Sequence, residues 1–178
     1  MRKSIYLWQL IGFVFTGVLG VLLHFLYDWT QNGFVALFSA VNESIWEHMK
    51  LLFVPMIIFA FIEGRHFDKK YENFWCAKLF GILTGLILIP ILYYTYTGVL
   101  GVSADWFNIA IFFIAAAVSY ALETRLIKSG MRCLISPATV KAVVIFIAVI
   151  FVIFTFVPPT IPLFEDPTAT RGLLAVRS

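Results

Sequence analysis

Charged residues are scarce in this sequence. Asp, Glu, Lys and Arg make up 13% of its 178 residues, whereas a soluble domain typically has roughly 25%. Hydrophobic residues account for 61%, and the mean hydropathy is +0.94. A small chain this apolar cannot cover its surface in water, so the composition excludes soluble enzymes, nucleic-acid-binding modules and disordered scaffolds. We therefore predict an integral membrane protein whose main partner is the lipid bilayer.

Cysteine and the common cofactor motifs are also scarce or absent. The two cysteines, Cys76 and Cys133, are too far apart in sequence to indicate a disulfide framework or a zinc knuckle, so we expect free thiols. The sequence contains no phosphate-binding glycine loop, no serine-nucleophile motif and no cofactor fingerprint. An enzymatic function therefore has the least direct support from motifs.

Five apolar runs are long enough to cross a bilayer, whose hydrocarbon core of about 30 Å needs about 20 helical residues. The predicted spans are residues 5–29, 44–63, 74–97, 104–127 and 137–157. The apolar stretch 33–41 is too short to span, and we expect it to lie at the interface or to re-enter the membrane. The pattern predicts an all-α bundle of five transmembrane helices in one domain, residues 1–157, followed by a proline-rich tail, 158–178.

Small residues within the spans are expected to mark close helix contacts, because membrane helices pack best where their backbones can approach. The predicted contact positions are Gly12, Thr16, Gly20, Gly81, Gly85, Ala117 and Ala121.

Lys and Arg are distributed unequally between the two sides of this bundle. Of the 13, three lie on the side opposite the N-terminus, namely Lys50, Arg171 and Arg177. Because cations are retained in cytoplasmic loops, we predict an N-in, C-out orientation, with the tail outside as a surface segment or a lid. The excess of basic over acidic residues then reflects membrane topology and gives no reason to expect a nucleic-acid partner.

Ionisable residues gather near the predicted outer ends of the first two spans. Such residues are costly within a membrane and usually face a site. The candidate pocket consists of His24, Asp28, Asn42, Glu43, Glu47, His48 and Lys50. Helical rise puts His24, Glu47 and His48 at a similar depth, about 7 Å below the outer boundary.

The pocket has two functional interpretations. Two imidazoles and a carboxylate suit zinc, iron or manganese, so His24, Glu47 and His48 form a candidate site for a divalent metal ion. Against it, Glu47 and His48 are adjacent and point about 100° apart on a helix. A proton or cation relay would use the same groups. Under either interpretation, replacing Glu47 with Leu is expected to disturb function more than stability.

A structural interpretation competes with both. Asn42 or Ser39 would cap the second span, whose positive end Glu43 and Glu47 would favour. Glu47 would pair with Lys50, and His48 would bond a neighbouring helix.

Three segments carry a resemblance to a known family. The segments HFLYDW at residues 24–29, VNESIWEHMK at 41–50 and PTIPLF at 159–164 resemble an uncharacterised family of small multi-pass membrane proteins from clostridia and related bacteria. The resemblance covers most of the chain, implies a bacterial plasma (inner) membrane and implies no activity.

Together these features favour a transport or solute-binding protein whose outward pocket holds a cation or a small polar solute. The alternatives are a membrane-embedded enzyme that uses the same pocket, with or without a metal, and a non-catalytic accessory or immunity subunit. A homo-oligomer is compatible with the sequence.

Overall fold

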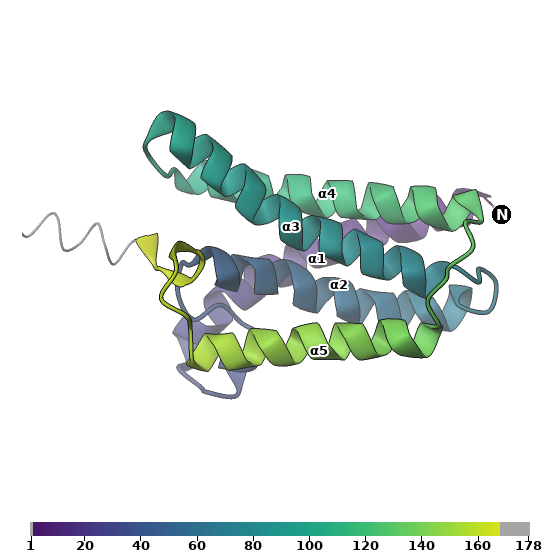
Figure 1. Ribbon diagram of the computed structural model, residues 1–178, viewed down its shortest axis with the longest axis horizontal. Coiled ribbons are helices and arrows are strands. Elements are labelled where there is room, and N and C mark those ends of the chain that lie inside the picture. The colour runs from purple at the N-terminus through teal and green to yellow at the C-terminus, as the bar shows by residue number, and fades with distance from the viewer. Residues whose placement is uncertain (1, 168–178) are drawn as a thin grey trace, which may run out of the picture.

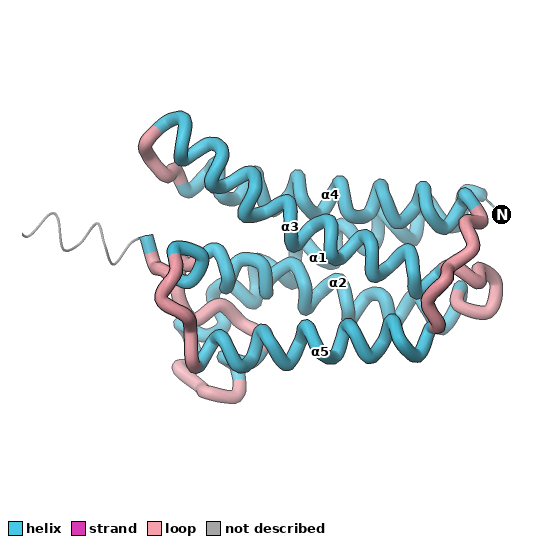
Figure 2. Tube along the Cα trace, in the orientation of Figure 1, coloured by secondary structure: helices cyan, strands magenta, loops and turns pink. Residues whose placement is uncertain are grey.

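Long helices dominate the architecture (Figures 1 and 2). The computed structural model describes residues 2–167, and this part of the chain contains no strand. Its long helices are α1 (Arg2–Thr30), α2 (Ile45–Phe67), α3 (Phe74–Leu100), α4 (Asp105–Ser129) and α5 (Pro137–Phe156). All five are long and apolar enough to cross a membrane, which confirms the all-α fold class of the prediction. The orientation in the membrane stays a prediction.

The helix boundaries follow local sequence signals. Ser44 begins α2 by accepting a hydrogen bond from the Glu47 backbone N–H, and Ser136 does the same for α5 with Thr139. Such N-caps satisfy backbone donors that the first turn of a helix leaves free. Gly101 and Gly130 end α3 and α4 with φ of +70° and +64°, a conformation that glycine adopts without steric cost.

The most buried of the five spans is α2, and the least buried is α5. Helix α2 packs against α1 and α3, while α3 and α4 form an antiparallel hairpin. Toward the end of the bundle where the C-terminal segment lies, this hairpin diverges from α2 (Figure 1). A pocket lined mainly by residues of α1, α2 and α4 lies beside the N-terminal end of α2.

Glycines make the close helix contacts possible, as predicted. A Cβ atom on Gly12 would lie 2.5 Å from the Phe59 ring, and one on Gly85 would lie 2.5 Å from the Ser119 hydroxyl. The prediction is wrong for Ala117 and Ala121, which are exposed. Helix α4 instead buries Ala115, Ala116 and Ser119. The run of small residues in this helix does not reveal from sequence which face turns inward.

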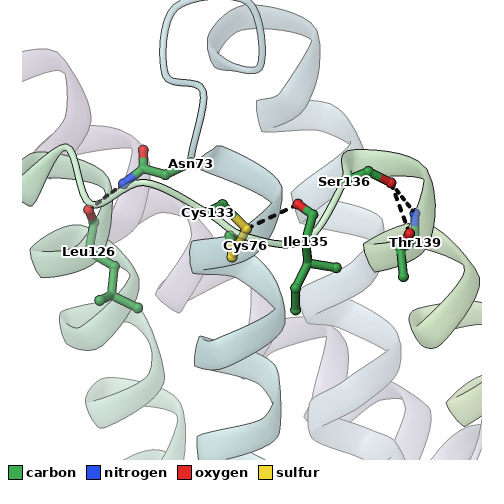
Figure 3. The surroundings of a disulfide bond; sticks show 7 residues. All are labelled: Asn73, Cys76, Leu126, Cys133, Ile135, Ser136 and Thr139. Atoms are coloured by element: carbon green, nitrogen blue, oxygen red, sulfur yellow. Dashed lines mark hydrogen bonds between the residues drawn. A yellow bond between two sulfur atoms is a disulfide. The ribbon is translucent and has the colours of Figure 1, made fainter.

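The expectation of free thiols is also wrong. Cys76, at the start of α3, and Cys133, in the loop between α4 and α5, form a disulfide with a Cα–Cα distance of 6.0 Å (Figure 3). The α3–α4 hairpin returns the chain to the same end of the bundle, so a sequence separation of 57 residues becomes a direct contact. Asn73 strengthens this end by donating a hydrogen bond to the Leu126 carbonyl at 2.7 Å.

Two short 3-10 helices cover the opposite end. The first, η1 (Val35–Leu37), is held against α1 by Ser39, whose hydroxyl donates to the Leu23 carbonyl and accepts from the Tyr27 N–H.

The second, η2 (Pro162–Phe164), brings the described part of the tail onto α2, where the Phe164 and Trp46 rings lie 4.8 Å apart. Residues 168–178 of the predicted tail lie outside the described residues.

Candidate metal site

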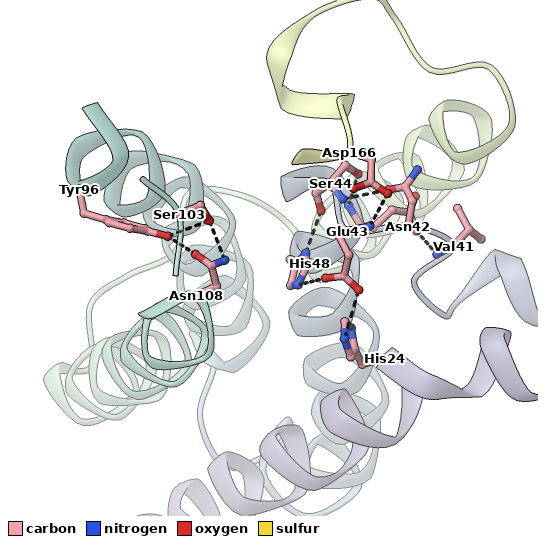
Figure 4. Close-up of polar contacts among 11 residues, drawn as sticks. His24, Val41, Asn42, Glu43, Ser44, His48, Tyr96, Ser103, Asn108 and Asp166 are labelled. Carbon is pink, nitrogen blue, oxygen red and sulfur yellow. Dashed lines mark hydrogen bonds and ion pairs between the residues drawn. The ribbon is translucent and has the colours of Figure 1, made fainter. Parts of the chain in front are cut away.

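Two histidines and one glutamate meet beside the N-terminal end of α2. His24 comes from α1, His48 from α2, and Glu43 from the turn that precedes α2 (Figure 4). The His24 Nε2 and His48 Nε2 atoms each lie 3.5 Å from a different Glu43 carboxylate oxygen, and the two imidazole rings are 5.4 Å apart. Each residue offers a donor atom within 4.8 Å of the other two. All three side chains are partly buried.

The local fold around Ser44 explains why Glu43 reaches the histidines. The Asn42 side chain accepts a hydrogen bond from the Ser44 N–H at 3.0 Å, which stabilises a tight turn before the N-cap. Glu43 thus lies outside the helix, and its side chain is not confined to a helical face. Its own backbone N–H donates to Asp166 at 3.4 Å, so the tail also contacts this turn.

A backbone contact sets the protonation pattern of His48. Its Nδ1 atom lies 2.9 Å from the Ser44 carbonyl oxygen, which can only accept, so Nδ1 carries the proton. In the neutral ring, the free lone pair then lies on the Nε2 atom, which faces Glu43. Metal-binding histidines in proteins commonly have this arrangement. Among the described residues, His24 Nδ1 has no hydrogen-bond partner, so the His24 ring is free to present either nitrogen.

A pocket of about 460 Å³ adjoins the three residues. Helix α4 forms its far wall and contributes two polar side chains, Asp105 and Asn108. Asn108 is held by the Tyr96 hydroxyl and by Ser103 (Figure 4). The other lining residues are glycine or apolar, namely Gly20, Val21, Phe25, Leu51, Ile109, Phe112 and Phe113.

Two residues of the predicted pocket, Glu47 and Lys50, turn away from it. Their side chains form an ion pair at 2.6 Å and are almost completely buried. Lys50 also donates to the Ala36 carbonyl and to Thr155, each at 2.9 Å, and Glu47 accepts from Thr155 at 2.9 Å. The structure therefore separates Glu47 from the two histidines with which it was predicted to bind metal. The pair instead joins α2 to α5 and η1.

The remaining predicted residues, Asp28 and Asn42, take minor positions. Asp28 is exposed near the end of α1 and is not among the residues that line the pocket. Asn42 holds the turn that carries Glu43. The expectation that Asn42 or Ser39 caps α2 is wrong, because Ser44 is the N-cap.

Sequence reasoning missed a second buried cluster, formed by Glu63, Lys78 and Glu123 near the opposite end of the bundle. The predicted N-in, C-out orientation places Lys78 among the cations on the same side as the N-terminus. Lys78 and Glu123 nevertheless lie inside the predicted spans, several residues from the nearest end, and that position was the available signal.

Comparison with known proteins identifies the family. Residues 1–173 match the family described as "Family of unknown function (DUF6512)", and the chain belongs to it. No curated protein and no solved structure matches the chain.

Proposed function

We propose that this DUF6512 protein is a multi-pass protein of the bacterial inner membrane that binds a divalent transition-metal ion in a pocket open to the outside. The ligands would be His24, Glu43 and His48. The observation that carries the proposal is the convergence of these donor atoms, from two helices and a turn, within 4.8 Å of one another.

The distances fit a metal ion without large rearrangement. Ligand atoms about 2.0–2.2 Å from a tetrahedral zinc ion lie roughly 3.4 Å from each other. Both histidine nitrogens lie 3.5 Å from a Glu43 oxygen. An ion could therefore enter the cluster by small side-chain rotations.

The chemistry of the donors favours a transition metal over calcium or magnesium. Calcium and magnesium prefer oxygen ligands, whereas imidazole suits zinc, copper, iron and nickel. Two of the three donors here are imidazoles. Zinc is the natural first probe because it readily accepts a mixture of histidine and carboxylate ligands.

Charge around the pocket supports cation entry. Asp105 lines the pocket opposite the histidines, and Glu43 is 43% exposed at its mouth. Both are acids, and their combined field would attract a cation. The unequal distribution of Lys and Arg supports an outward direction for this end of the bundle.

A calorimetric titration of detergent-purified, metal-free protein with Zn²⁺ tests the proposal. We expect binding of one ion, and we expect His24→Ala, His48→Ala and Glu43→Gln each to weaken it by more than about 100-fold, because changes even outside the ligand set typically cost about 10–100-fold. His66→Ala is the matched control, since His66 is exposed at the far end of α2. Absence of Zn²⁺ binding to wild-type protein would refute the proposal, as would equal affinity in all four variants.

Carriage of the bound cation across the membrane is the favoured use of the site. Proteoliposomes that contain a zinc-sensitive dye should fill faster with wild-type protein than with His48→Ala. Equal rates would restrict the role of the site to binding.

One observation favours an enzyme as a second candidate. Three protein ligands leave a coordination position free for water or substrate, and a pocket of about 460 Å³ is far larger than a bare ion needs. A metal-dependent enzyme would retain Zn²⁺ through purification and would not move it into proteoliposomes. Bound zinc combined with no transport would therefore support this alternative.

A further inference from the structure

The second buried cluster has no part in the proposed metal site. It joins Glu63 of α2, Lys78 of α3 and Glu123 of α4, whose side chains are 1%, 3% and 1% exposed. The Lys78 ammonium pairs with Glu63 Oε2 and, at 2.5 Å, with Glu123 Oε2. One cation is thus held between two acids.

The polar neighbours of the cluster are few. From α1, Gln9 donates a hydrogen bond to Glu63 Oε1 at 2.8 Å. From α4, Tyr120 places its ring 5.4 Å from the Lys78 ammonium, while its hydroxyl is 2.8 Å from the Thr16 hydroxyl. From α5, Lys141 lines the same small cavity as Lys78 and lies over the Trp75 ring at 4.6 Å.

Apolar side chains seal the cluster on both sides along the bundle. Toward the N-terminal end lie the buried residues Ile5, Phe67, Phe74, Ala77 and Ile127. Toward the centre lies the main core, which includes Met56, Phe59, Ile82 and Ala116. The charges are therefore held in a dry environment of low dielectric constant.

The charges of the cluster do not balance. One ammonium and two carboxylates sum to −1 when all three are ionised. A net charge in a dry interior is strongly unfavourable, and buried groups avoid it by pairing or by neutralisation. Among the described residues, Glu123 Oε1 and Gln9 Oε1 also have no hydrogen-bond partner, so the cluster has more acceptors than donors. One added proton removes the net charge and converts one of these acceptors into a donor.

We propose that Glu63, Lys78 and Glu123 form a proton-binding site in which the two carboxylates share one exchangeable proton. Binding adds a proton from water to a carboxylate oxygen and changes the charge of the cluster from −1 to zero. The N-terminal end of the bundle is the nearer end for all three residues, and proton exchange there requires a transient opening of the apolar layer that includes Ile5, Phe67 and Phe74. Because this end is opposite the metal site, the proposal is independent of metal binding.

Substitutions change the charge balance in a defined way. Glu63→Gln and Glu123→Gln each leave one carboxylate and one ammonium, a neutral pair that needs no proton. Glu72→Gln is the matched control, because Glu72 is exposed in the loop between α2 and α3.

Infrared spectroscopy of the full-length protein detects the proton directly. At neutral pH we expect a carbonyl stretch of a protonated carboxylic acid that shifts in D₂O and with ¹³C-labelled glutamate. The band should be lost in Glu63→Gln and in Glu123→Gln and kept in Glu72→Gln. A wild-type spectrum without the band, or a band that persists in either cluster variant, would overturn the proposal.

The pH dependence of stability provides a second measurement. A proton that the native state holds and the unfolded state releases makes the folding equilibrium constant fall by up to tenfold per pH unit as pH rises. Wild type and Glu72→Gln should show this fall above about pH 5, where an unfolded glutamate has lost its proton, and Glu123→Gln should lack that component. Equal pH slopes in wild type and Glu123→Gln would contradict a shared proton.

Discussion

Removing the ammonium of Lys50 should lower the unfolding free energy of the protein far more than removing any charge at the candidate metal site. The Lys50 side chain is 0% exposed, and that of its partner Glu47 is 2% exposed. Lys50→Met leaves the Glu47 carboxylate buried without its cation. Glu47→Leu leaves the ammonium in the same situation, so the structure reverses the expectation from sequence that this variant would disturb function more than stability.

The size of the effect follows from this burial. Breaking a buried ion pair by removing one partner costs about 3–5 kcal/mol, whereas replacing both partners by apolar residues is often neutral. We therefore expect each single variant to lose about 3–5 kcal/mol of unfolding free energy and Glu47→Leu/Lys50→Met to lose less than either one. The double variant still loses the hydrogen bonds to Thr155 and the Ala36 carbonyl, which is a smaller penalty of about 1–3 kcal/mol.

Reversible unfolding of detergent-purified protein, monitored by circular dichroism, measures these free energies in a double-mutant cycle. Glu43→Gln is the control, because its side chain is 43% exposed and its loss should change stability by less than about 0.5 kcal/mol. The reasoning is refuted if the unfolding free energy of Lys50→Met lies within about 1 kcal/mol of that of wild type. A buried carboxylate that has lost its cation is expected to cost more than this. Additive single effects would refute it as well.

Three further outcomes follow from the fold. Gly85→Ala should destabilise the bundle by about 1–3 kcal/mol through overpacking, because the new Cβ atom would meet Ser119 and Leu52. Gly98→Ala should leave stability unchanged, since nothing lies within 4 Å of its Cβ position. Unfolding measurements compare the two variants, and equal losses of unfolding free energy would contradict the packing. Reducing the Cys76–Cys133 disulfide, which closes a 57-residue separation, should lower the unfolding free energy by up to about 4 kcal/mol in the chain-entropy estimate. Maleimide labelling without a reductant would show instead that the thiols are free. Reporter fusions after Lys70 and after Ser178 should read cytoplasmic and external respectively, and equal readings would contradict five crossings with the N-terminus inside.

The number of long apolar helices could be predicted because it depends on the length of apolar runs. Span length is set by bilayer thickness, and glycine-rich or polar segments mark the breaks. The inward face of each helix was harder to predict, since helices that are apolar all round carry little periodic signal. The misassignment of Ala117 and Ala121 has this cause. The disulfide depends on how the α3–α4 hairpin returns, which is a tertiary property.

The region of the candidate site could be located from sequence, but the sequence could not show which of its residues would contact one another. Intramembrane histidines and acids pointed to the end of α1 and α2 where His24, Glu43 and His48 lie together. Which glutamate meets His24 and His48 depends on where α2 begins. Because Ser44 caps the helix, Glu43 lies in the turn and reaches the histidines, while Glu47 lies in the first turn of the helix and points to Lys50. Glu63 and Glu123 could not be paired with Lys78 without knowledge of helix packing.

X-ray absorption spectroscopy of the Zn²⁺-loaded protein tests the central claim most directly. The account predicts a four- or five-coordinate zinc ion with two imidazole nitrogens and one carboxylate oxygen at about 2.0–2.2 Å. The imidazole signal should fall by one ligand in His24→Ala and in His48→Ala and remain unchanged in Glu47→Gln. A zinc shell without imidazole, or one that is identical in wild type and His48→Ala, would contradict a metal site at His24, Glu43 and His48.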